Sequence, residues 1–564
     1  MRFLLATALL LALAPTAPAQ TDGLQQIDDE TQRFLERQRT LGHLADGRLD
    51  VLPLSARDAR ALLDSLAARP DALTDTDRRL LAHLRGERPA GLLTRYAQAL
   101  SPELYRNNRT LLSVRGDAQG VPFGFEADAV LNLAYGPVQV YDAAGRRPQR
   151  TAWLNTRGVR AAGHAGRFFF ETRVEENQAR APEPRFVPQT APRLGFTLFR
   201  DSTYDYFNST GVIGYRGPVL EARFGRDRNR WGFARSSPYL SNYAAPYDHL
   251  QLRWTVWRLQ FTNLYARFTN PVRPAGARGD DLYQQRFGAF HRLAIRLPAG
   301  LEAEVFEAII FGADTTAFGR RASFFELAYL NPFQFYRGAE RDIGSPDNAL
   351  AGGGLAWQGL GGARLYGQLL LDELSFARLR DDWWGNKWAV VAGAEVSDPG
   401  LPGLGRLRGL DLRAEAARLR PYLYSHRGLG TAYVHFRDGL GHPAGPNAED
   451  LTLSARYVPS PDMEAVLDLA FTRRGRNTAT QNFGSDPLEP YTTRVSDDDV
   501  VMLQGVRQSN VLAEARLGYR LLPDATAGAA VLYVTRNDAE LGRTRYAVPQ
   551  VFLRWGVPFA STRY

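Results

Sequence analysis

Arginine and tryptophan stand close together at two places in the sequence, and both residue types are suited to binding sugars. A flat aromatic ring packs against the C–H face of a sugar, and a guanidinium group holds a carboxylate through two parallel hydrogen bonds. We therefore regard seven residues as candidates for polysaccharide binding. These candidates are Arg226, Arg228, Arg230, Trp231, Trp383, Trp384 and Trp388.

The same residues also have a purely structural interpretation. Arginines that alternate along a strand pair with aspartate and glutamate inside any water-lined barrel, and tryptophans populate the belts where a barrel meets the membrane surface. Asp347, Asn348, Asp372 and Glu373 likewise suit turn caps and ion pairs better than a cation site. Both interpretations of the arginines and tryptophans stay open at the level of sequence.

Signals for catalysis are weak. The sequence contains no GxSxG, HExxH or P-loop motif. His426, His435 and His442 lie close together but without the spacing of metal ligands, and Asp248-His249 is the one pair that suggests a catalytic rim. We expect no enzymatic activity, no metal site and no cofactor.

The elements that must position these residues are β-strands, because hydrophobicity alternates with a period of two from about Leu111 onward. Arg and Glu occupy the second face over nine to eleven residues, as in a membrane strand that borders a wet lumen. One example is the alternation of Leu451, Leu453, Ala455 and Tyr457 with Thr452, Ser454 and Arg456. At about 25 residues for each strand and its connection, this region predicts an all-β transmembrane barrel of about 18 antiparallel strands.

The stretch from Val551 to Tyr564 predicts the strand that closes the barrel. Val551, Leu553 and Trp555 point one way in an extended strand, and the intervening residues point the other. We expect this strand to pair with the first strand of the barrel, so that no sheet edge meets lipid.

Composition excludes several classes of protein. The chain has 564 residues, 11% of them aromatic, and no cysteine, so it forms no disulfide and no thiolate metal site. After residue 19 no run approaches the roughly 18 apolar residues of a membrane helix. The net charge is +9, but basic residues alternate with acidic ones, which argues against nucleic acid as a partner.

The sequence divides into three parts. Residues 1–19 predict a signal peptide, because Met1 and Arg2 precede an apolar run from Phe3 to Ala14, and the small residues Ala17-Pro18-Ala19 follow as a cleavage sequence. Residues 20–110 have a helical period, with capping-box patterns that begin at Ser55 and Thr74. We expect a small α-helical N-terminal segment, either periplasmic or packed into one mouth of the barrel. Residues 111–564 form the predicted barrel.

Four stretches differ from ordinary barrel strands, and together they carry a family resemblance over about residues 200–460. They are GRDRNRWG at 225–232 with SPYLSNYAAPYDHLQL at 237–252, FFELAYLNPFQFYRG at 324–338, DNALAGGGLAW at 347–357 with LYGQLLLDE at 365–373, and PYLYSH at 421–426 with LGHPAGPNAED at 440–450. In kind and order they resemble the Wzi type of bacterial capsule assembly protein.

This resemblance implies an 18-stranded outer-membrane barrel with a helical N-terminal portion, in a diderm bacterium. It further implies a non-catalytic lectin that binds capsular or exopolysaccharide and helps to anchor or assemble it at the cell surface. The expected partners are that polysaccharide and outer-membrane lipid, and no oligomeric state is predicted. The alternative function is a porin-like channel for small solutes.

Overall fold

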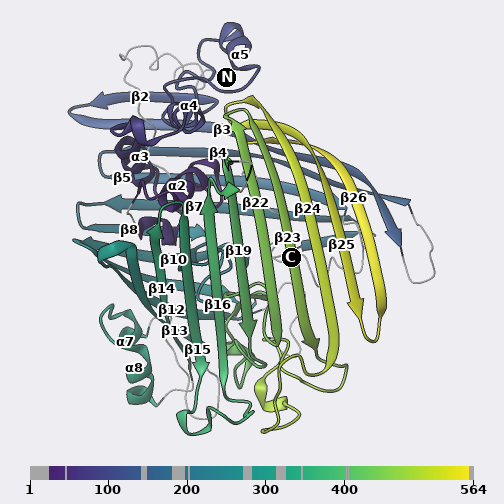
Figure 1. The fold of residues 1–564 in the computed structure, drawn as a ribbon. Helices are drawn as coiled ribbons and strands as arrows, with labels where there is room; N and C mark the ends of the chain where they lie inside the picture. The colour runs from purple at the N-terminus through teal and green to yellow at the C-terminus, as the bar shows by residue number, and fades with distance from the viewer. Residues whose placement is uncertain are drawn as a thin grey trace.

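The fold is a closed antiparallel β-barrel of 18 strands, as the sequence predicted (Figure 1). The computed structural model describes residues 24–557 except 45–46, 142–148, 181–196, 201–202, 271–282, 313–325, 345–346, 402 and 404. The predicted signal peptide at 1–19 and the aromatic residue Tyr564 lie outside the described residues. None of the described helices is long and apolar enough to cross a membrane.

The strands of the ring follow the order of the chain. They are β3 (Val121–Tyr141), β4 (Gln149–Ala165), β5 (Phe168–Arg180), β7 (Thr203–Arg216), β8 (Leu220–Asp227), β10 (Tyr247–Val256), β11 (Leu259–Thr269), β12 (Gln285–Arg296), β13 (Leu301–Gly312), β14 (Asn348–Leu360), β15 (Ala363–Glu373), β16 (Lys387–Ser397), β19 (Leu410–Leu419), β22 (Ala448–Ser460), β23 (Met463–Arg476), β24 (Val506–Leu522), β25 (Ala525–Asp538) and β26 (Gly542–Trp555).

Shorter elements lie beside or inside this ring. The helices are α2 (Glu30–Thr40), α3 (Ala56–Ala67), α4 (Asp75–Leu84), α5 (Thr94–Leu100), α7 (Leu327–Leu330) and α8 (Tyr336–Ile343). The short strands are β1 (Val51–Leu52), β2 (Leu112–Ala118), β6 (Thr197–Arg200), β9 (Arg230–Trp231), β17 (Gly400–Leu401), β18 (Gly405–Arg406), β20 (Val434–His435) and β21 (Asp438–Gly439).

The ring closes where β26 pairs with β3. Residues 545–555 of β26 pair with residues 131–141 of β3, and β2 pairs with residues 121–127 along the same edge of β3. The sequence predicted that the last strand would pair with the first strand of the barrel, and this pairing of β26 with β3, the first strand of the ring, confirms it. β2 continues the line of β26 along the same edge of β3.

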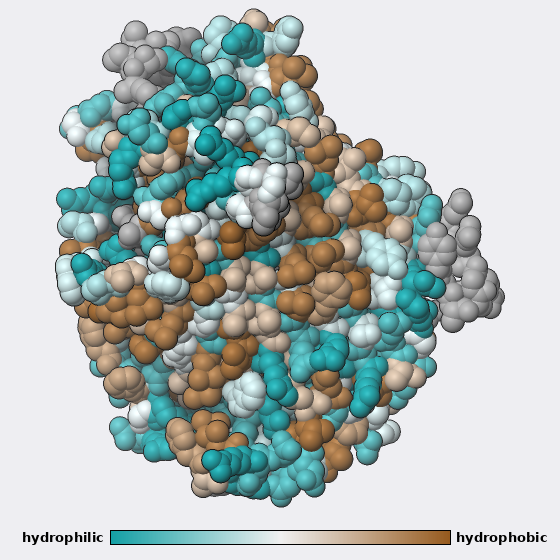
Figure 2. Space-filling view, in the orientation of Figure 1, coloured by the Kyte–Doolittle hydropathy of each residue, from teal (hydrophilic) through white to brown (hydrophobic). Residues whose placement is uncertain are grey.

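The outer face of the wall is largely apolar, and β23 shows the pattern. Met463, Leu467 and Phe471 are 37%, 43% and 39% exposed, whereas Val466 and Asp468 between them point inward and are buried. At about 3.3 Å per residue and a tilt near 40°, this stretch spans roughly the 25 Å of an apolar membrane band. Figure 2 shows apolar side chains gathered over the middle of the barrel wall.

The two ends of the barrel differ in the length of their connections. At one end the turns are short: residues 461–462 join β22 to β23, and residues 523–524 join β24 to β25. At the other end residues 374–386, 420–447 and 477–505 form long loops. We call these the short-turn end and the long-loop end.

Helices α2, α3 and α4 lie at the short-turn end and enter the lumen (Figure 1). The side chain of Ser55 caps α3 by accepting from Asp58 N, and Thr74 caps α4 by accepting from Asp77 N, as the sequence predicted. Their apolar faces meet in one buried cluster with Phe34 of α2. Helices α2, α3 and α4 therefore form a packed plug that the barrel surrounds.

Two long connections also fold into the lumen and fill it with apolar side chains. Trp231 and Tyr239, between β8 and β10, belong to one buried cluster with Tyr424 and Tyr433, between β19 and β22. The hydroxyl of Tyr433 donates to Tyr239 O at 2.5 Å. Tyr239 also packs against Gly352 of β14, where a Cβ atom would lie 2.5 Å from its ring. Much of the sequence that carries the family resemblance therefore packs inside the barrel.

Replacing Leu467 with arginine tests whether this outer face meets lipid. A charge at that depth should destabilise the folded barrel in bilayers by about 2–4 kcal/mol. The measurement is the urea dependence of folding into phosphatidylcholine vesicles, followed by heat-modifiable migration on a gel. The control is Thr480→Arg, which adds the same charge to an exposed loop position. Equal effects of the two changes would contradict a lipid-facing wall.

Candidate functional site

The plug is held in the lumen by buried ion pairs, and Arg37 of α2 makes the largest set. Its guanidinium group lies 3.0 Å from Asp77, 2.7 Å from Asp398 and 2.7 Å from Asp411. Asp77 belongs to the plug, whereas Asp398 and Asp411 belong to the barrel. Arg37 thus joins α2 and α4 to the wall. Its guanidinium group is occupied by these three carboxylates.

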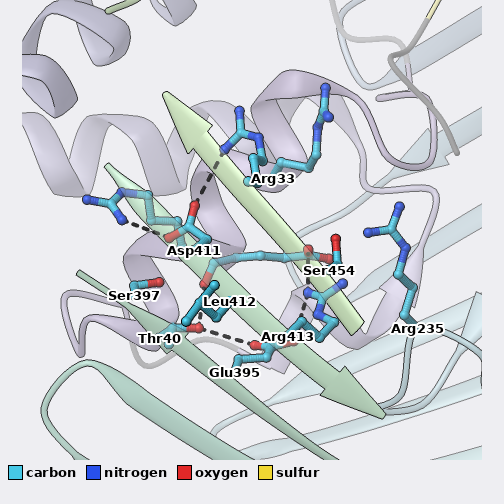
Figure 3. Close-up of a pocket in the computed structure, with 12 residues that line it drawn as sticks. Arg33, Thr40, Arg235, Glu395, Ser397, Asp411, Leu412, Arg413 and Ser454 are labelled. Carbon is cyan, nitrogen blue, oxygen red and sulfur yellow. Dashed lines mark hydrogen bonds and ion pairs between the residues drawn. The ribbon is translucent and has the colours of Figure 1, made fainter. Parts of the chain in front are cut away.

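A small cavity lies between α2 and the barrel wall (Figure 3). Arg413 and Glu395 of the wall pair across it at 2.7 Å, and Thr40 of α2 donates to Glu395 at 3.2 Å. The cavity holds about 60 Å³. Since about 10–15 Å³ of such space holds one water molecule, the cavity has room for several waters.

Two of the predicted site residues lie inside the protein. Arg230 pairs with Asp28 and Glu36 of the N-terminal segment, both at 3.1 Å, and Trp231 is fully buried in the lumen. The short strand that contains them pairs with Val51 and Leu52. These contacts support the structural interpretation of Arg230 and Trp231.

Arg226 and Arg228 lie near the long-loop end. Arg226 faces outward and pairs with Asp248 at 3.3 Å, and Asp248 also pairs with Arg267 of β11. The Nε atom of Arg228 donates to Ala244 O at 3.0 Å. The structure thus separates Arg226 and Arg228 from Arg230, although the sequence places them together.

The residues that suggested catalysis have structural partners as well. Asp248 forms the ion pairs just described, and the Nδ1 atom of buried His249 lies 3.1 Å from Tyr247 O. Within the described part of the chain, no group of three or more histidine or acidic side chains is arranged to hold a metal ion. Asp372 pairs with Lys387 at 3.1 Å, in agreement with the ion-pair interpretation.

Trp388 belongs to the outer wall. Its neighbours in β16, Lys387 and Ala389, are fully buried and point into the lumen, so Trp388 points outward. It stands next to the end of β16 that leads to the long loops. This is the place of an interfacial tryptophan, and it is apart from Trp383 and Trp384.

Trp383 and Trp384 do come together, and a third aromatic residue joins them from a distant loop. Their ring centroids lie 5.6 Å apart, and the ring of Tyr491 lies 4.6 Å from that of Trp384. All three side chains are half-buried. We call Trp383, Trp384 and Tyr491 the aromatic platform.

Two arginines lie over the aromatic platform. Arg494 lies 4.2 Å from the ring of Trp384, and Arg378 lies 5.2 Å from the ring of Trp383. Such cation–π contacts fix the rings in place. Both arginines are also paired with aspartates: Arg494 with Asp497 at 2.6 Å, and Arg378 with Asp498.

Backbone hydrogen bonds join the loops that form the aromatic platform. Trp384 N donates to Asp497 O at 3.0 Å, and Val500 N donates to Asp382 O at 2.7 Å. Tyr491 N donates to His426 O at 3.3 Å. Three long loops are therefore tied into one surface, which gives the rings a fixed geometry before any ligand arrives.

The surroundings of the aromatic platform are rich in exposed carboxylates. The exposed acidic residues nearby in the chain are Asp381, Asp382, Asp497, Asp498 and Asp499. A carboxylate accepts hydrogen bonds from sugar hydroxyls but repels an acidic polymer. Stacking together with hydroxyl binding is what this arrangement can do chemically.

Burial changes the acid–base behaviour of two groups beside the aromatic platform. Burial, together with the charges of Lys387 and Arg427, lowers the pKa of His426 to about 3. Burial near Glu373 and Asp372 raises the pKa of Tyr491 to about 12. Both side chains are therefore neutral at ordinary pH.

Sequence reasoning missed Tyr491 and Arg494. The segment around them is long and polar and carries Asp497, Asp498 and Asp499, which suggests only a solvated loop. Tyr491 lies more than a hundred positions from Trp384, and no periodicity links two loops at that separation. Only the closed barrel brings them together.

The fold and the site define a class: a closed β-barrel with a filled lumen and an aromatic surface on its long loops. Among solved structures the chain is similar to Wzi from Escherichia coli, an outer-membrane protein involved in group 1 capsule assembly and a carbohydrate-binding β-barrel. The identity is 13%, the likeness covers 96% of this chain and 100% of that one, and the TM-score is 0.53. At this identity the likeness shows the fold.

Outer-membrane barrels from Pseudomonas aeruginosa are more distant. OpdK is 9% identical with a TM-score of 0.41, and OpdL is 10% identical with a TM-score of 0.40. Each likeness covers 76% of this chain and 98% of the other. No protein-family model and no curated protein matches the sequence.

Acid should loosen the loops around the aromatic platform. Because the pKa of His426 is about 3 in the folded protein and about 6.5 when unfolded, the unfolded loop binds more protons between these values. The contribution of neutral His426 to the stability of the folded loops is therefore fully present above about pH 6.5 and is lost as the pH falls toward about 3. Near-ultraviolet circular dichroism follows the Trp384–Tyr491 pair during this titration.

The matched variant is His426→Gln, which can keep a hydrogen bond to Thr431 Oγ1, 2.6 Å from His426 Nδ1 in the wild type, but does not titrate. It should shift the loss of signal to lower pH. Burial also lowers the pKa of His435 to about 3. Part of the acid dependence therefore remains in the His426→Gln variant. Identical titrations of the two proteins would exclude His426 as a cause.

Proposed function

We propose that this protein is a non-catalytic outer-membrane barrel that binds surface polysaccharide and helps to anchor or assemble capsule or exopolysaccharide. In this proposal residues 1–19 direct export, residues 20–110 form the plug, and residues 111–564 span the outer membrane with the long loops outside. The observation that carries it is the aromatic platform, which three loops hold open to solvent at the long-loop end.

The aromatic platform supports a saccharide ligand for a physical reason. Half-buried rings offer flat apolar faces, and the paired Arg–Asp side chains around them offer fixed donors and acceptors. Because both arginines are already matched by aspartates, we infer a hydroxyl-rich polymer of low acidity. Likeness in fold to a carbohydrate-binding barrel supports a saccharide ligand.

Retention of the polymer would come from many weak contacts. A repeating polysaccharide presents the same unit to neighbouring barrels, and each further contact forms at high effective concentration. A shallow, solvent-open platform suits this mode better than a deep pocket would. Individual affinity can then be low while the whole polymer stays on the surface.

The packing of the lumen favours this function over a channel for small solutes. Plug helices and two inward-folded connections fill the barrel with apolar clusters and ion pairs. Purified protein in a planar bilayer should therefore show no steady large conductance. A stable open channel carried by the folded, heat-modifiable protein would favour the porin alternative and count against the polysaccharide proposal.

Removal of the aromatic platform should weaken polymer binding. We expect Trp383→Ala with Trp384→Ala to lower the affinity for purified surface polysaccharide of the producing strain about thirtyfold, since each of the two stacked rings contributes about 1 kcal/mol. The measurement is surface plasmon resonance on immobilised protein, together with retention of polymer on cells.

Trp388→Ala is the matched control, because it removes the same side chain from the outer wall. It should leave binding unchanged. Heat-modifiable migration confirms that each variant is folded. Unchanged binding by the double variant would remove Trp383 and Trp384 from the site.

A further inference from the structure

The described part of the connection between β13 and β14, residues 326–344, lies on the outer wall of the barrel instead of over its mouth. Figure 1 shows its helices α7 and α8 outside the ring of strands. Tyr329, Tyr336 and Ala339 of this segment pack against Ala289 and Ile309 of the wall. We call residues 326–344 the strap.

The wall positions under the strap face outward. In β12, Arg286 and Arg292 are fully buried and point into the lumen, so Ala289 and His291, which have the opposite parity, point away from it. In β13, Ile309 pairs with Ala289 across the two strands and shares this face. The strap therefore covers a surface that lipid would otherwise contact.

Beneath the strap the outer wall is polar, which is unusual for a barrel. His291 Nε2 lies 2.8 Å from Glu307 Oε2, near the middle of their strands. Asn263 of β11 faces the same way, and its Nδ2 atom donates to Pro332 O at 3.3 Å. Side chains like these are costly against acyl chains and need internal partners.

The strap supplies those partners from its own backbone. The amides of Tyr336 and Arg337, at the start of α8, both donate to Glu307 at 3.0 Å. The ring of Tyr336 stacks on His291 with centroids 4.3 Å apart, and Tyr265 OH donates to Leu330 O at 2.7 Å. The polar patch of the wall is thus matched by polar groups of the strap.

The other side of the strap is apolar. Leu327, Phe333 and Phe335 are each 78% exposed. Phe333 also stacks on Phe261 of the outer wall at 5.5 Å. Below the strap the exposed apolar wall continues with Val305. The strap therefore presents an apolar outer surface at the place where the wall beneath it is polar.

We propose that the strap is embedded in the outer leaflet and that membrane-lipid acyl chains cover Leu327, Phe333 and Phe335. Lipid is the occupant that fits, because the exposed face of the strap is continuous with the lipid-facing wall. Beside it Arg226 and Arg267 flank Asp248 at the rim, at the level of lipid headgroups. The inference rests on the membrane placement of the barrel but not on polysaccharide binding.

The absence of cysteine makes a direct test possible. Nitroxide labels at Leu327→Cys, Phe333→Cys and Phe335→Cys are compared in vesicles of phosphatidylcholine and phosphatidylglycerol. Val305→Cys reports the wall, and Thr480→Cys reports an aqueous loop. Collision with oxygen measures contact with lipid, and collision with a water-soluble nickel chelate measures contact with water.

We expect the strap labels to behave like the label at residue 305, with high oxygen and low nickel accessibility. Nickel accessibility like that at residue 480 would overturn the proposal, because the strap would then lie in water. Low accessibility to both reagents would also overturn it, because protein would then cover the strap. Water contact at residue 305 itself would instead contradict the placement of the barrel in a membrane.

A second variant tests what holds the strap in place. Glu307→Leu removes the acceptor for the two amides of α8 and makes this position of the wall apolar. The label at residue 333 should become more mobile and gain nickel accessibility, whereas Asp342→Asn, an exposed change on the strap, should have no effect. If Glu307→Leu leaves the label unchanged, Glu307 does not anchor the strap. Polymer binding at the aromatic platform stays an independent readout.

Discussion

Closure of the sheet is the constraint on which the other features depend. A strand edge cannot face lipid, so β26 must pair with β3, and every strand between them then has one outer face and one inner face. The outer face must be apolar, which produces the two-residue period of the sequence. A ring of this size also encloses a lumen too wide for its own side chains to fill, and in this chain other segments occupy it.

The lumen is filled by parts that the barrel itself cannot supply. Helices enter at the short-turn end, and two connections fold inward from the long-loop end. Buried ion pairs such as those of Arg37 add little net stability, since desolvation offsets the attraction. Removing one partner is nevertheless costly, about 3–5 kcal/mol, so these pairs favour one position of the plug over all others.

The sequence predicted the barrel and its strand number because alternation is a local property that lipid enforces on every strand. It could not assign the tryptophans, because three environments select the same side chain. Trp231 fills the lumen, Trp388 stands on the wall, and Trp384 lies on the loops. The partners that distinguish them, Asp28 for the strand of Trp231 and Tyr491 for Trp384, are remote in sequence. Only tertiary contacts carry that information.

The residues of the wall form the closed sheet, and the residues of the lumen pack against one another. Ligand binding is therefore left to the connections that protrude from the barrel. The aromatic platform lies on loops joined by backbone hydrogen bonds, so loop residues can differ without disturbing closure. The strap follows the same logic on the outer wall, where Glu307 is tolerated because α8 donates to it. At the strap, polar groups that the barrel cannot satisfy are matched by a connection that folds back over them. The barrel thus determines where a binding surface can form, and the side chains of its connections determine what that surface can bind.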